Sequence, residues 1–351
     1  MGQVHSRSSL EPQHDLTSSH FLLKKHFSFA ALNLTHGNCA NSPDSFSSNP
    51  FCNGKLLQDD DLPYPLDITP AFQLVSPETY DHIDKQKKYD LPGYEEHIDR
   101  IQLRHVLFRY VWQGNFSSPL DEELKRGIRV LDIGCGSGSW VLDMSAQYPN
   151  SSFIGIDMCS DYFPSKDLPS NVHFQKLNVL DGLPFADGEF DFVHSRFLVQ
   201  YLTELQWNEF IKELIRVTRS KGWIELMEMD MIFHNAGPHS TKLQDSTINY
   251  FQNQGIQAVI STSLQTYLRS TDAFTLINYD HRSSPLGRWA GRLGVYTLIY
   301  FSLAYKNMMR VLPKYMNINE DEYCVLLERF RGECELFGTL MDTFRICCEK
   351  K

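Results

Sequence analysis

The chain has 351 residues, of which 42% are hydrophobic and 13% aromatic, enough to build the core of one or two domains. Its formal net charge of -10 at pH 7 opposes binding to a phosphate backbone, so we expect no nucleic-acid substrate. No stretch reaches the ~18 apolar residues that a helix needs to span a bilayer, so we expect no transmembrane segment.

The 8 cysteines are scattered and form no C-x-x-C pair. This pattern indicates reduced thiols in an intracellular compartment rather than a disulfide frame or a metal site. We therefore expect a cytoplasmic protein without a metal, with the nucleus as an alternative location.

Residues 1–65 are rich in Ser, Asn, His and Asp and show no sustained period, which predicts a disordered tail. Its start, MGQVHS, matches the myristoylation pattern with Gly2 as the acceptor, although a chance match in a Ser-rich tail is the competing interpretation. One acyl chain would give only weak, reversible membrane association. The apolar stretch 21–32 is split by two lysines and lacks a clear cleavage site, so we expect no signal peptide.

Apolar residues at helical spacing then predict a lead-in helix over 94–112, after which strands and helices alternate. We predict strands over 129–134, 152–157, 172–178, 189–195, 223–233, 275–282 and 343–348. We predict helices over 139–148, 207–219, 248–268 in two pieces, 294–309 and 317–338. The second of these helices is expected to end near Gly222, and the last to have Asn319 as its cap. This order predicts an α/β fold with a doubly wound, mostly parallel seven-stranded sheet, whose ligands bind beyond the carboxyl ends of the strands.

Three glycines, Gly134, Gly136 and Gly138, follow the first strand and open a helix, so that backbone amides can approach a ligand closely. Their G-x-G-x-G spacing differs from the G-x-G-x-x-G fingerprint of dinucleotide sites. Asp132 precedes them, and its carboxylate would oppose a pyrophosphate but suit the ammonium or sulfonium end of an amino-acid-like ligand. The charge therefore favours S-adenosylmethionine (SAM) over NAD.

Polar groups also end the next two strands. The carboxylate of Asp157 can accept hydrogen bonds from both hydroxyls of a ribose, and a solvent-facing turn aspartate is the alternative. The Asn178 carbonyl and the Val179 amide can bond to the edge of an adenine. Together with Asp132, these residues complete a three-strand adenosyl site.

The segments VLDIGCGSG, FIGID, LNVLDGLPFADGEFDFVHSRF and RVTRSKGWIELME resemble successive motifs of class I SAM-dependent methyltransferases. The lead-in KKYDLPGYEEHIDRIQLRHVLFRYVWQG, with SSPLGRW and TFRICCEKK, resembles the fungal LaeA-like group of secondary-metabolism methyltransferases. The resemblance covers residues 75–351. It implies a Rossmann-like methyltransferase domain with a core over 128–235 and a helical substrate or lid region over 236–330.

Carried onto this chain, the resemblance implies that Asp132, Gly134 and Gly136 face the methionine, Asp157 the ribose, and Asn178 and Val179 the adenine, with Met158 packed on the adenine. Gly138 completes the predicted cofactor site. Asn178 replaces the more usual Asp of the family, and Ser220-Lys221-Gly222 replaces the usual Pro-Gly-Gly turn before strand five.

The residues after the fourth strand lie nearest the transferred methyl in this fold, which makes His194 the candidate general base. A buried, hydrogen-bonded histidine is an equal alternative, and His105 and His234 are weaker candidates. The C-terminal helices carry four aromatic residues that line either a substrate pocket or the core: Tyr296, Tyr300, Phe301 and Tyr305.

The sequence thus predicts a SAM-dependent methyltransferase that acts on an oxygen or nitrogen of a small metabolite. A LaeA-like regulator that keeps the fold and acts through protein partners is the alternative, and a nicotinamide-dependent oxidoreductase is third.

Overall fold

The computed structural model describes residues 94–351, and their side chains from Arg100 onward. The predicted tail over 1–65 and the acylation motif at Gly2 lie outside the described residues. Within the described part of the chain, no helix is long and apolar enough to cross a bilayer, and no group of three metal-ligating side chains occurs.

Seven strands form one sheet in the order β3-β2-β1-β4-β5-β7-β6. The strands are β1 (Arg129–Ile133), β2 (Ser152–Asp157), β3 (Val172–Lys176), β4 (Phe190–Arg196), β5 (Thr218–His234), β6 (Phe274–Pro285) and β7 (Leu340–Lys350). The first five strands are parallel, whereas β7 runs antiparallel to both β5 and β6. The predicted doubly wound seven-stranded sheet is confirmed, and it is mixed through this one reversed strand.

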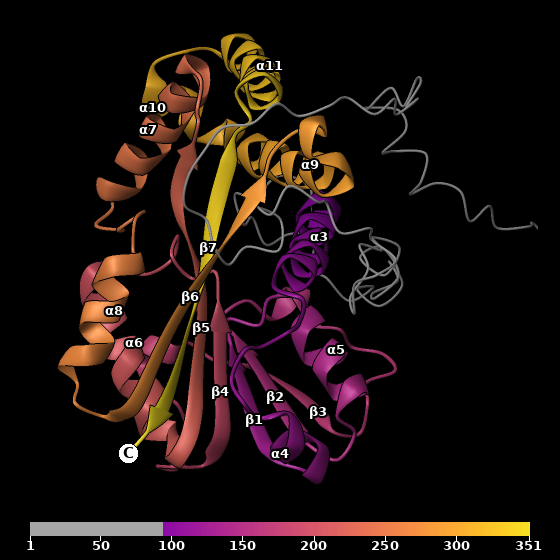
Figure 1. Cartoon of the computed structure of the whole chain (residues 1–351), viewed down its shortest axis with the longest axis vertical. Coiled ribbons are helices and arrows are strands. Elements are labelled where there is room, and N and C mark those ends of the chain that lie inside the picture. The colour runs from indigo at the N-terminus through magenta and orange to yellow at the C-terminus, as the bar shows by residue number, and fades with distance from the viewer. Residues whose placement is uncertain (1–93) are drawn as a thin grey trace, which may run out of the picture. The chain divides into compact units, whose positions relative to one another are not determined.

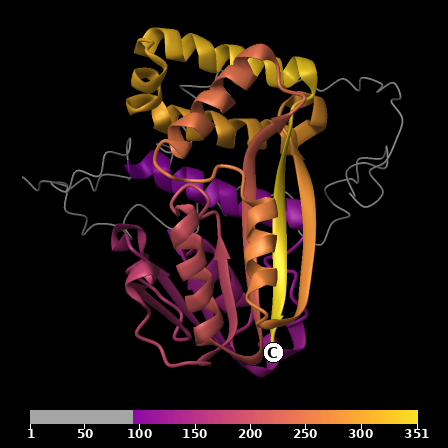
Figure 2. The same cartoon turned by 90° about the vertical axis from the view of Figure 1, so that its left-hand side faces the viewer.

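Helices cover both faces of the sheet and one of its ends. They are α3 (Tyr94–Trp112), α4 (Asp121–Arg126), α5 (Ser139–Gln147), α6 (Glu204–Val217), α7 (Pro238–Gln252), α8 (Ser261–Ser270), α9 (Gly291–Asn307), α10 (Leu312–Met316) and α11 (Glu320–Phe337), with single 3₁₀ turns η3 (Ser160–Tyr162), η4 (Val179–Asp181), η5 (Arg288–Ala290) and η6 (Met308–Arg310). Figure 1 shows α3 and α5 on one side of the sheet and α6 and α8 on the other. Figure 2 shows α7 and α9–α11 as a layer beyond the sheet end, with α3 beneath α9.

Local sequence signals explain where these helices begin. Thr203 caps α6 in a capping box with Gln206, and the helix buries Trp207, Phe210 and Leu214 along one face. The predicted cap Asn319 is confirmed, because its side chain accepts from Glu322 N at 2.8 Å and Glu322 reaches back to Asn319 N at 2.8 Å. Capped ends and one apolar face fix both helices against the core.

The predicted turn at Ser220-Lys221-Gly222 is wrong, and so is the helix end near Gly222. Helix α6 ends at Val217, and β5 begins at once with Thr218. Thr218 pairs with Phe190 and Trp223 with Phe192, so the intervening residues bulge out of the ladder, with Lys221 at a φ of 59°. The Lys and Gly that signalled a turn therefore form a β-bulge.

The long strand β5 connects the sheet to the helical layer at its end. It has 17 residues, whereas the other parallel strands have five to seven.

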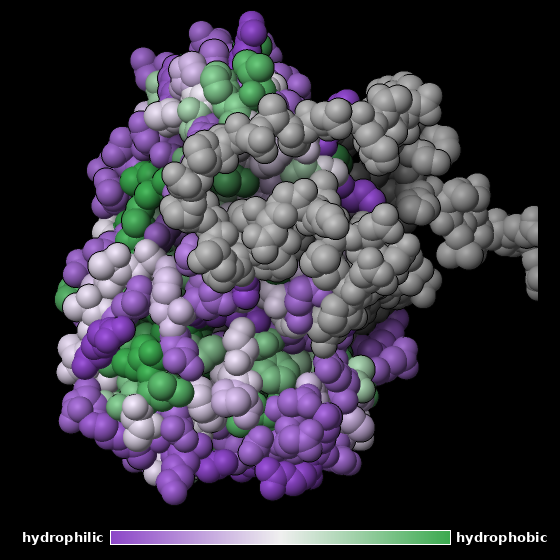
Figure 3. All heavy atoms as spheres, in the orientation of Figure 1, coloured by the Kyte–Doolittle hydropathy of each residue, from purple (hydrophilic) through white to green (hydrophobic). Residues whose placement is uncertain are grey.

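Exposed apolar side chains occur on the edge strand β6 at Leu276 and Tyr279. Figure 3 shows a face that is mainly hydrophilic, with separate hydrophobic patches. The larger of two hydrophobic clusters among the described residues joins the sheet to the helices beyond its end.

Candidate functional site

The glycine loop between β1 and α5 is tied to the end of β2. The amides of Gly134 and Cys135 both donate to the Ile156 carbonyl, at 2.8 and 3.0 Å. Gly134, Gly136 and Gly138 all have positive φ, from 55° to 72°, a conformation that side-chain-bearing residues rarely adopt.

The three glycines have different neighbours. A Cβ at Gly134 would lie 2.7 Å from Leu198 Cδ2, and one at Gly138 would overlap the ring of Phe174. At Gly136 the nearest atom to such a Cβ would be Ile101 Cγ2, at 3.8 Å. Gly138 therefore allows α5 to pack on β3, while Gly136 leaves the most room beside the loop.

Asp157 ends β2 and is bonded to the same loop. One carboxylate oxygen accepts from Gly136 N at 2.9 Å and the other from Cys159 N at 2.9 Å. Burial raises the pKa of Asp157, although the hydrogen bonds from these two backbone amides act to lower it. The structure therefore brings two of the predicted site residues, Gly136 and Asp157, into direct contact.

The expected adenine contacts lie at the ends of β2 and β3. Met158 follows Asp157 and is 60% exposed, an apolar side chain open to solvent. The Asn178 side-chain carbonyl accepts from Leu180 N at 3.2 Å and caps η4, which begins at Val179. The Asn178 oxygen that was expected to bond to a base thus already has a backbone donor.

Asp132 and His194 form a buried pair in the interior of the sheet. They are register partners on β1 and β4, and His194 Nδ1 lies 2.8 Å from Asp132 Oδ1. The imidazole stacks on the Trp140 indole with a centroid distance of 3.9 Å and an interplanar angle of 4°. Burial holds the pKa of His194 below its ordinary value, although Asp132 opposes this shift. These contacts are those of the hydrogen-bonded interior histidine that the sequence left as an alternative.

A second buried network joins α3, α5 and the end of β4. Arg196 Nη2 donates to His105 Nδ1 at 3.1 Å, and His105 Nε2 lies 3.2 Å from Asp143 Oδ2. Because Nδ1 faces a donor, Nε2 carries the proton of this imidazole. Burial lowers the pKa of His105 to about 4 and that of Arg196 to about 9. His105 is therefore neutral at pH 7 and Arg196 charged.

The third histidine candidate lies apart from the glycine loop. His234 ends β5, its side chain is 51% exposed, and its Nε2 lies 3.0 Å from Asp342 Oδ2 of β7.

Glu228 anchors the loop that follows β4. Its oxygens accept from Leu198 N at 2.7 Å and from Val199 N at 3.1 Å. Glu228 is fully buried, and burial raises its pKa to about 8. This role of Glu228 was not predicted from the sequence, although a carboxylate within the apolar strand segment LMEMDM is a signal for it.

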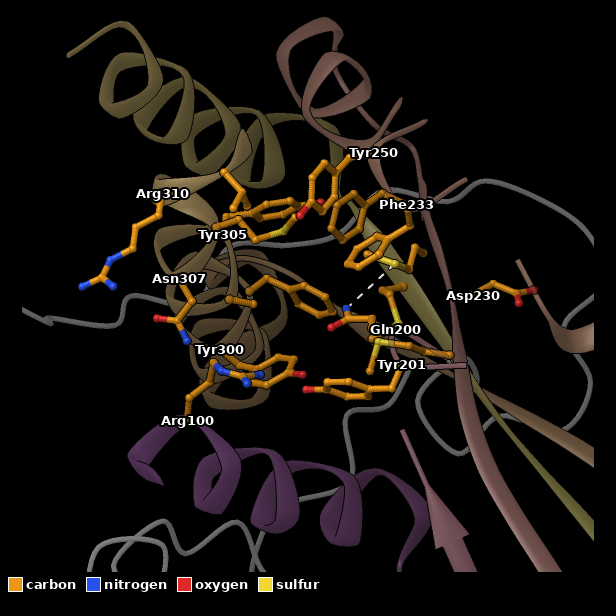
Figure 4. Close-up of a pocket in the computed structure, with 18 residues that line it drawn as sticks. Arg100, Gln200, Tyr201, Asp230, Phe233, Tyr250, Tyr300, Tyr305, Asn307 and Arg310 are labelled. Atoms are coloured by element: carbon orange, nitrogen blue, oxygen red, sulfur yellow. Dashed lines mark hydrogen bonds between the residues drawn. The ribbon is translucent and has the colours of Figure 1, made fainter. Parts of the chain in front are cut away.

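A cavity of about 270 Å³ lies on the other side of that loop (Figure 4). Gln200 and Tyr201 of the loop line it, opposite α9 and η6. Of the four aromatic residues considered from the sequence, Tyr300, Phe301 and Tyr305 line the cavity, whereas Tyr296 is not among its lining residues. The 18 lining residues are Arg100, Gln200, Tyr201, Met229, Asp230, Met231, Phe233, Tyr250, Phe251, Tyr300, Phe301, Ala304, Tyr305, Asn307, Met308, Arg310, Val311 and Met341.

The loop of residues 197–201 therefore has two neighbours. Leu198 lies against Gly134 of the glycine loop, whereas Gln200 and Tyr201 face the cavity. Helix α3 is shared in the same way, because Ile101 lies nearest Gly136 while the preceding Arg100 lines the cavity. The glycine loop and the cavity thus share common walls.

Comparison with known proteins shows which family model the region around the glycine loop matches. Residues 130–222, which include the glycine loop, Asp157 and Asn178, match the family model of the methyltransferase domain. This part of the chain is therefore similar to methyltransferase domains, and fungal methyltransferases are among its relatives.

Three relatives illustrate this similarity. Methyltransferase str3 of Strobilurus tenacellus is 34% identical over 45% of this chain and 57% of its own length. Secondary metabolism regulator laeA of Coprinopsis cinerea is 27% identical over 58% of this chain and 54% of its own. N-methyltransferase verN of Clonostachys rogersoniana is 28% identical over 58% of this chain and 71% of its own. The chain thus spans little more than half the length of the first two.

Proposed function

We propose that this protein transfers a methyl group from SAM to an oxygen or nitrogen of a small molecule. The observation that carries the proposal is the arrangement of two regions on either side of the loop 197–201. On one side, the glycine loop contacts Asp157 beside the ends of β1, β2 and β3. On the other side lies the cavity of about 270 Å³.

The residues present fit SAM. A Cβ would meet a neighbouring side chain at Gly134 and Gly138, and Gly136 remains the open position of the loop. Asp132 and Asp157 supply negative charge for an ammonium group and for ribose hydroxyls, and Met158 offers an exposed apolar surface for a base. Bound SAM would supply an electrophilic methyl group, so the protein mainly has to align the acceptor.

We assign His194 a positioning role in this proposal. Its ring is enclosed by Trp140 and Asp132, and its bond to Asp132 fixes the carboxylate that would face the methionine ammonium group. The neutral state of the buried ring keeps the carboxylate charge available for that ligand.

A transfer assay tests the function. The full-length protein is incubated with SAM carrying a labelled methyl group and with a metabolite extract. We expect label in a small molecule with the wild type, and loss of the transfer with Asp157→Ala. A matched control, Asp245→Ala, removes an exposed carboxylate on α7 and should retain the activity. Absence of transfer to any extract component would contradict the enzymatic function.

A regulatory function is the second candidate, favoured by the similarity to the regulator of Coprinopsis cinerea. In that case the chain would act through protein partners. Equal recovery of a stable partner by the wild type and by Asp157→Ala, without methyl transfer, would favour this role.

We also propose a cytoplasmic location, with the nucleus as the alternative, and weak membrane association if Gly2 is acylated. The location is supported by the cysteines, because the six in the described part of the chain are all free thiols.

A further inference from the structure

We infer that the cavity beside the loop 197–201 binds a planar, largely apolar carboxylic acid, with the carboxylate at Arg100 and the rings among the aromatic side chains of α9 and β5. The inference rests on the proposed function in taking this cavity as the acceptor site.

The walls favour a flat, apolar ligand. Phe233 of β5 and Phe301 of α9 meet edge to face, with centroids 5.3 Å apart at 80°, and Tyr300 packs against Phe301 at 77°. Four methionines, Met229, Met231, Met308 and Met341, complete the apolar surface with adaptable side chains. The volume lies slightly below the roughly 300–1,000 Å³ usual for drug-sized ligands, which indicates a compact molecule.

Positive charge lies at one side of the cavity. The Arg100 guanidinium carbon is 5.8 Å from the centroid of the Tyr300 ring, and Arg310 lines the cavity from η6. Figure 4 shows Arg100 beside Tyr300 and Asn307, and Arg310 pointing away from the other labelled side chains. Both arginines also make other interactions, so an incoming carboxylate would share Arg100 with them. A guanidinium is well suited to bind a carboxylate through two parallel hydrogen bonds.

The acidic residue among the lining residues, Asp230, bonds to the start of α8. Asp230 Oδ1 accepts from Ile260 N at 2.7 Å and from Ser261 N at 3.0 Å, and Oδ2 accepts from Ser261 Oγ at 2.6 Å. Figure 4 shows the Asp230 carboxylate directed away from the other labelled side chains. Its charge is thus committed to the start of α8 and does not face Arg100.

Two other ligand classes fit less well. Aromatic walls can bind a quaternary or protonated amine by cation–π attraction, but the guanidinium of Arg100 beside Tyr300 would repel it. A neutral aromatic compound would fill the apolar part and make no charge-assisted hydrogen bond to Arg100. A matched acid and amide therefore separate these cases.

Calorimetric titration of the full-length protein with 2-naphthoate and 2-naphthamide at pH 7.5 tests the inference. The protein is first saturated with S-adenosylhomocysteine, the demethylated product of SAM. We expect the acid to bind at least about tenfold more tightly than the amide, since the two differ mainly in charge. Equal affinities, tighter binding of the amide, or binding of neither probe would overturn the inference.

Two variants test whether Arg100 causes the preference for the acid over the amide. Arg100→Met keeps a side chain of similar length and should bring the ratio of the two affinities close to one. The control Arg126→Met, on an exposed arginine of α4, should keep the wild-type ratio. An unchanged ratio in Arg100→Met, with its thermal unfolding unaltered, would contradict the role of Arg100. If S-adenosylhomocysteine does not bind, the proposed function fails. Titration of the ligand-free protein with the same acid and amide then still tests whether the cavity prefers the acid.

Discussion

At the scale of single residues, the contacts of His194 separate two roles that its sequence position allowed. A general base must reach the proton of the acceptor, whereas His194 contacts Asp132 and Trp140 in the interior. The structure thus favours an indirect effect of His194, through the orientation of the Asp132 carboxylate.

Two substitutions of His194 test this role. His194→Asn keeps a donor near the position of Nδ1, whereas His194→Phe keeps an aromatic ring against Trp140 and loses the donor to Asp132. We expect His194→Phe to raise the Kd and KM for SAM by about tenfold, since a hydrogen bond to a charged group is lost, and His194→Asn to recover much of this affinity. Both variants should keep the wild-type pH profile of kcat. A fall of kcat by about 10²–10⁴ in both, with an altered pH profile, would instead identify a general base.

The glycines of the loop differ in the cost of adding a methyl group. Gly138→Ala places a Cβ in the ring of Phe174 at a φ of 71°, whereas Gly182→Ala has a φ of 81° and no atom within 4 Å. Both substitutions place a Cβ on a residue with positive φ and cause similar backbone strain. The difference between their unfolding free energies therefore reports the overlap with Phe174 alone. Urea unfolding should show Gly138→Ala to be less stable than Gly182→Ala by about 2 kcal/mol.

A second substitution checks the cause of that difference. Adding Phe174→Leu to Gly138→Ala should recover part of the lost stability by relieving the contact. Equal unfolding free energies for the two alanine variants would contradict the packing role of Gly138.

At the scale of elements, Glu228 connects β5 to the loop after β4. Its pKa is raised from 4.5 to about 8 in the folded protein, so the folded state binds the proton more tightly than the unfolded state does. Unfolding therefore releases a proton between these values, and the stabilising contribution present at low pH is lost as the pH rises through about 8.

Comparison with Glu228→Gln isolates this contribution. Between pH 5.5 and pH 7.5, the unfolding free energy of the wild type should fall relative to the variant by up to about 1.4 kcal/mol per pH unit. The control Glu209→Gln, on the exposed face of α6, should show a constant difference. A wild-type advantage over Glu228→Gln that stays constant or grows with pH would contradict the raised pKa.

At the scale of the whole molecule, the alternation of strands and helices could be predicted because each element carries its own period and caps. The glycine loop, the cap at Asn319 and the strand ending at Asp157 are all local signals of this kind. The bulge at Ser220-Lys221-Gly222 was mistaken for a turn because Gly and Lys suit both, and only pairing with β4 distinguishes them.

The cavity could not be predicted in the same way. It depends on α3 packing beneath α9 and on β7 running antiparallel beside β5, contacts between residues far apart in the chain. The sequence named Tyr300, Phe301 and Tyr305 without deciding between pocket and core. Arg100 and Tyr201 joined them only when the fold brought these segments together.

The central claim is that the glycine loop and Asp157 hold SAM. Thermal unfolding of the full-length protein with SAM, S-adenosylhomocysteine or NAD tests it most directly, because a ligand of the folded state stabilises by ~2.7 kcal/mol at 100 times its Kd. We predict a rise in Tm with SAM and with S-adenosylhomocysteine, and none with NAD. A rise with NAD and none with the other two would contradict the account.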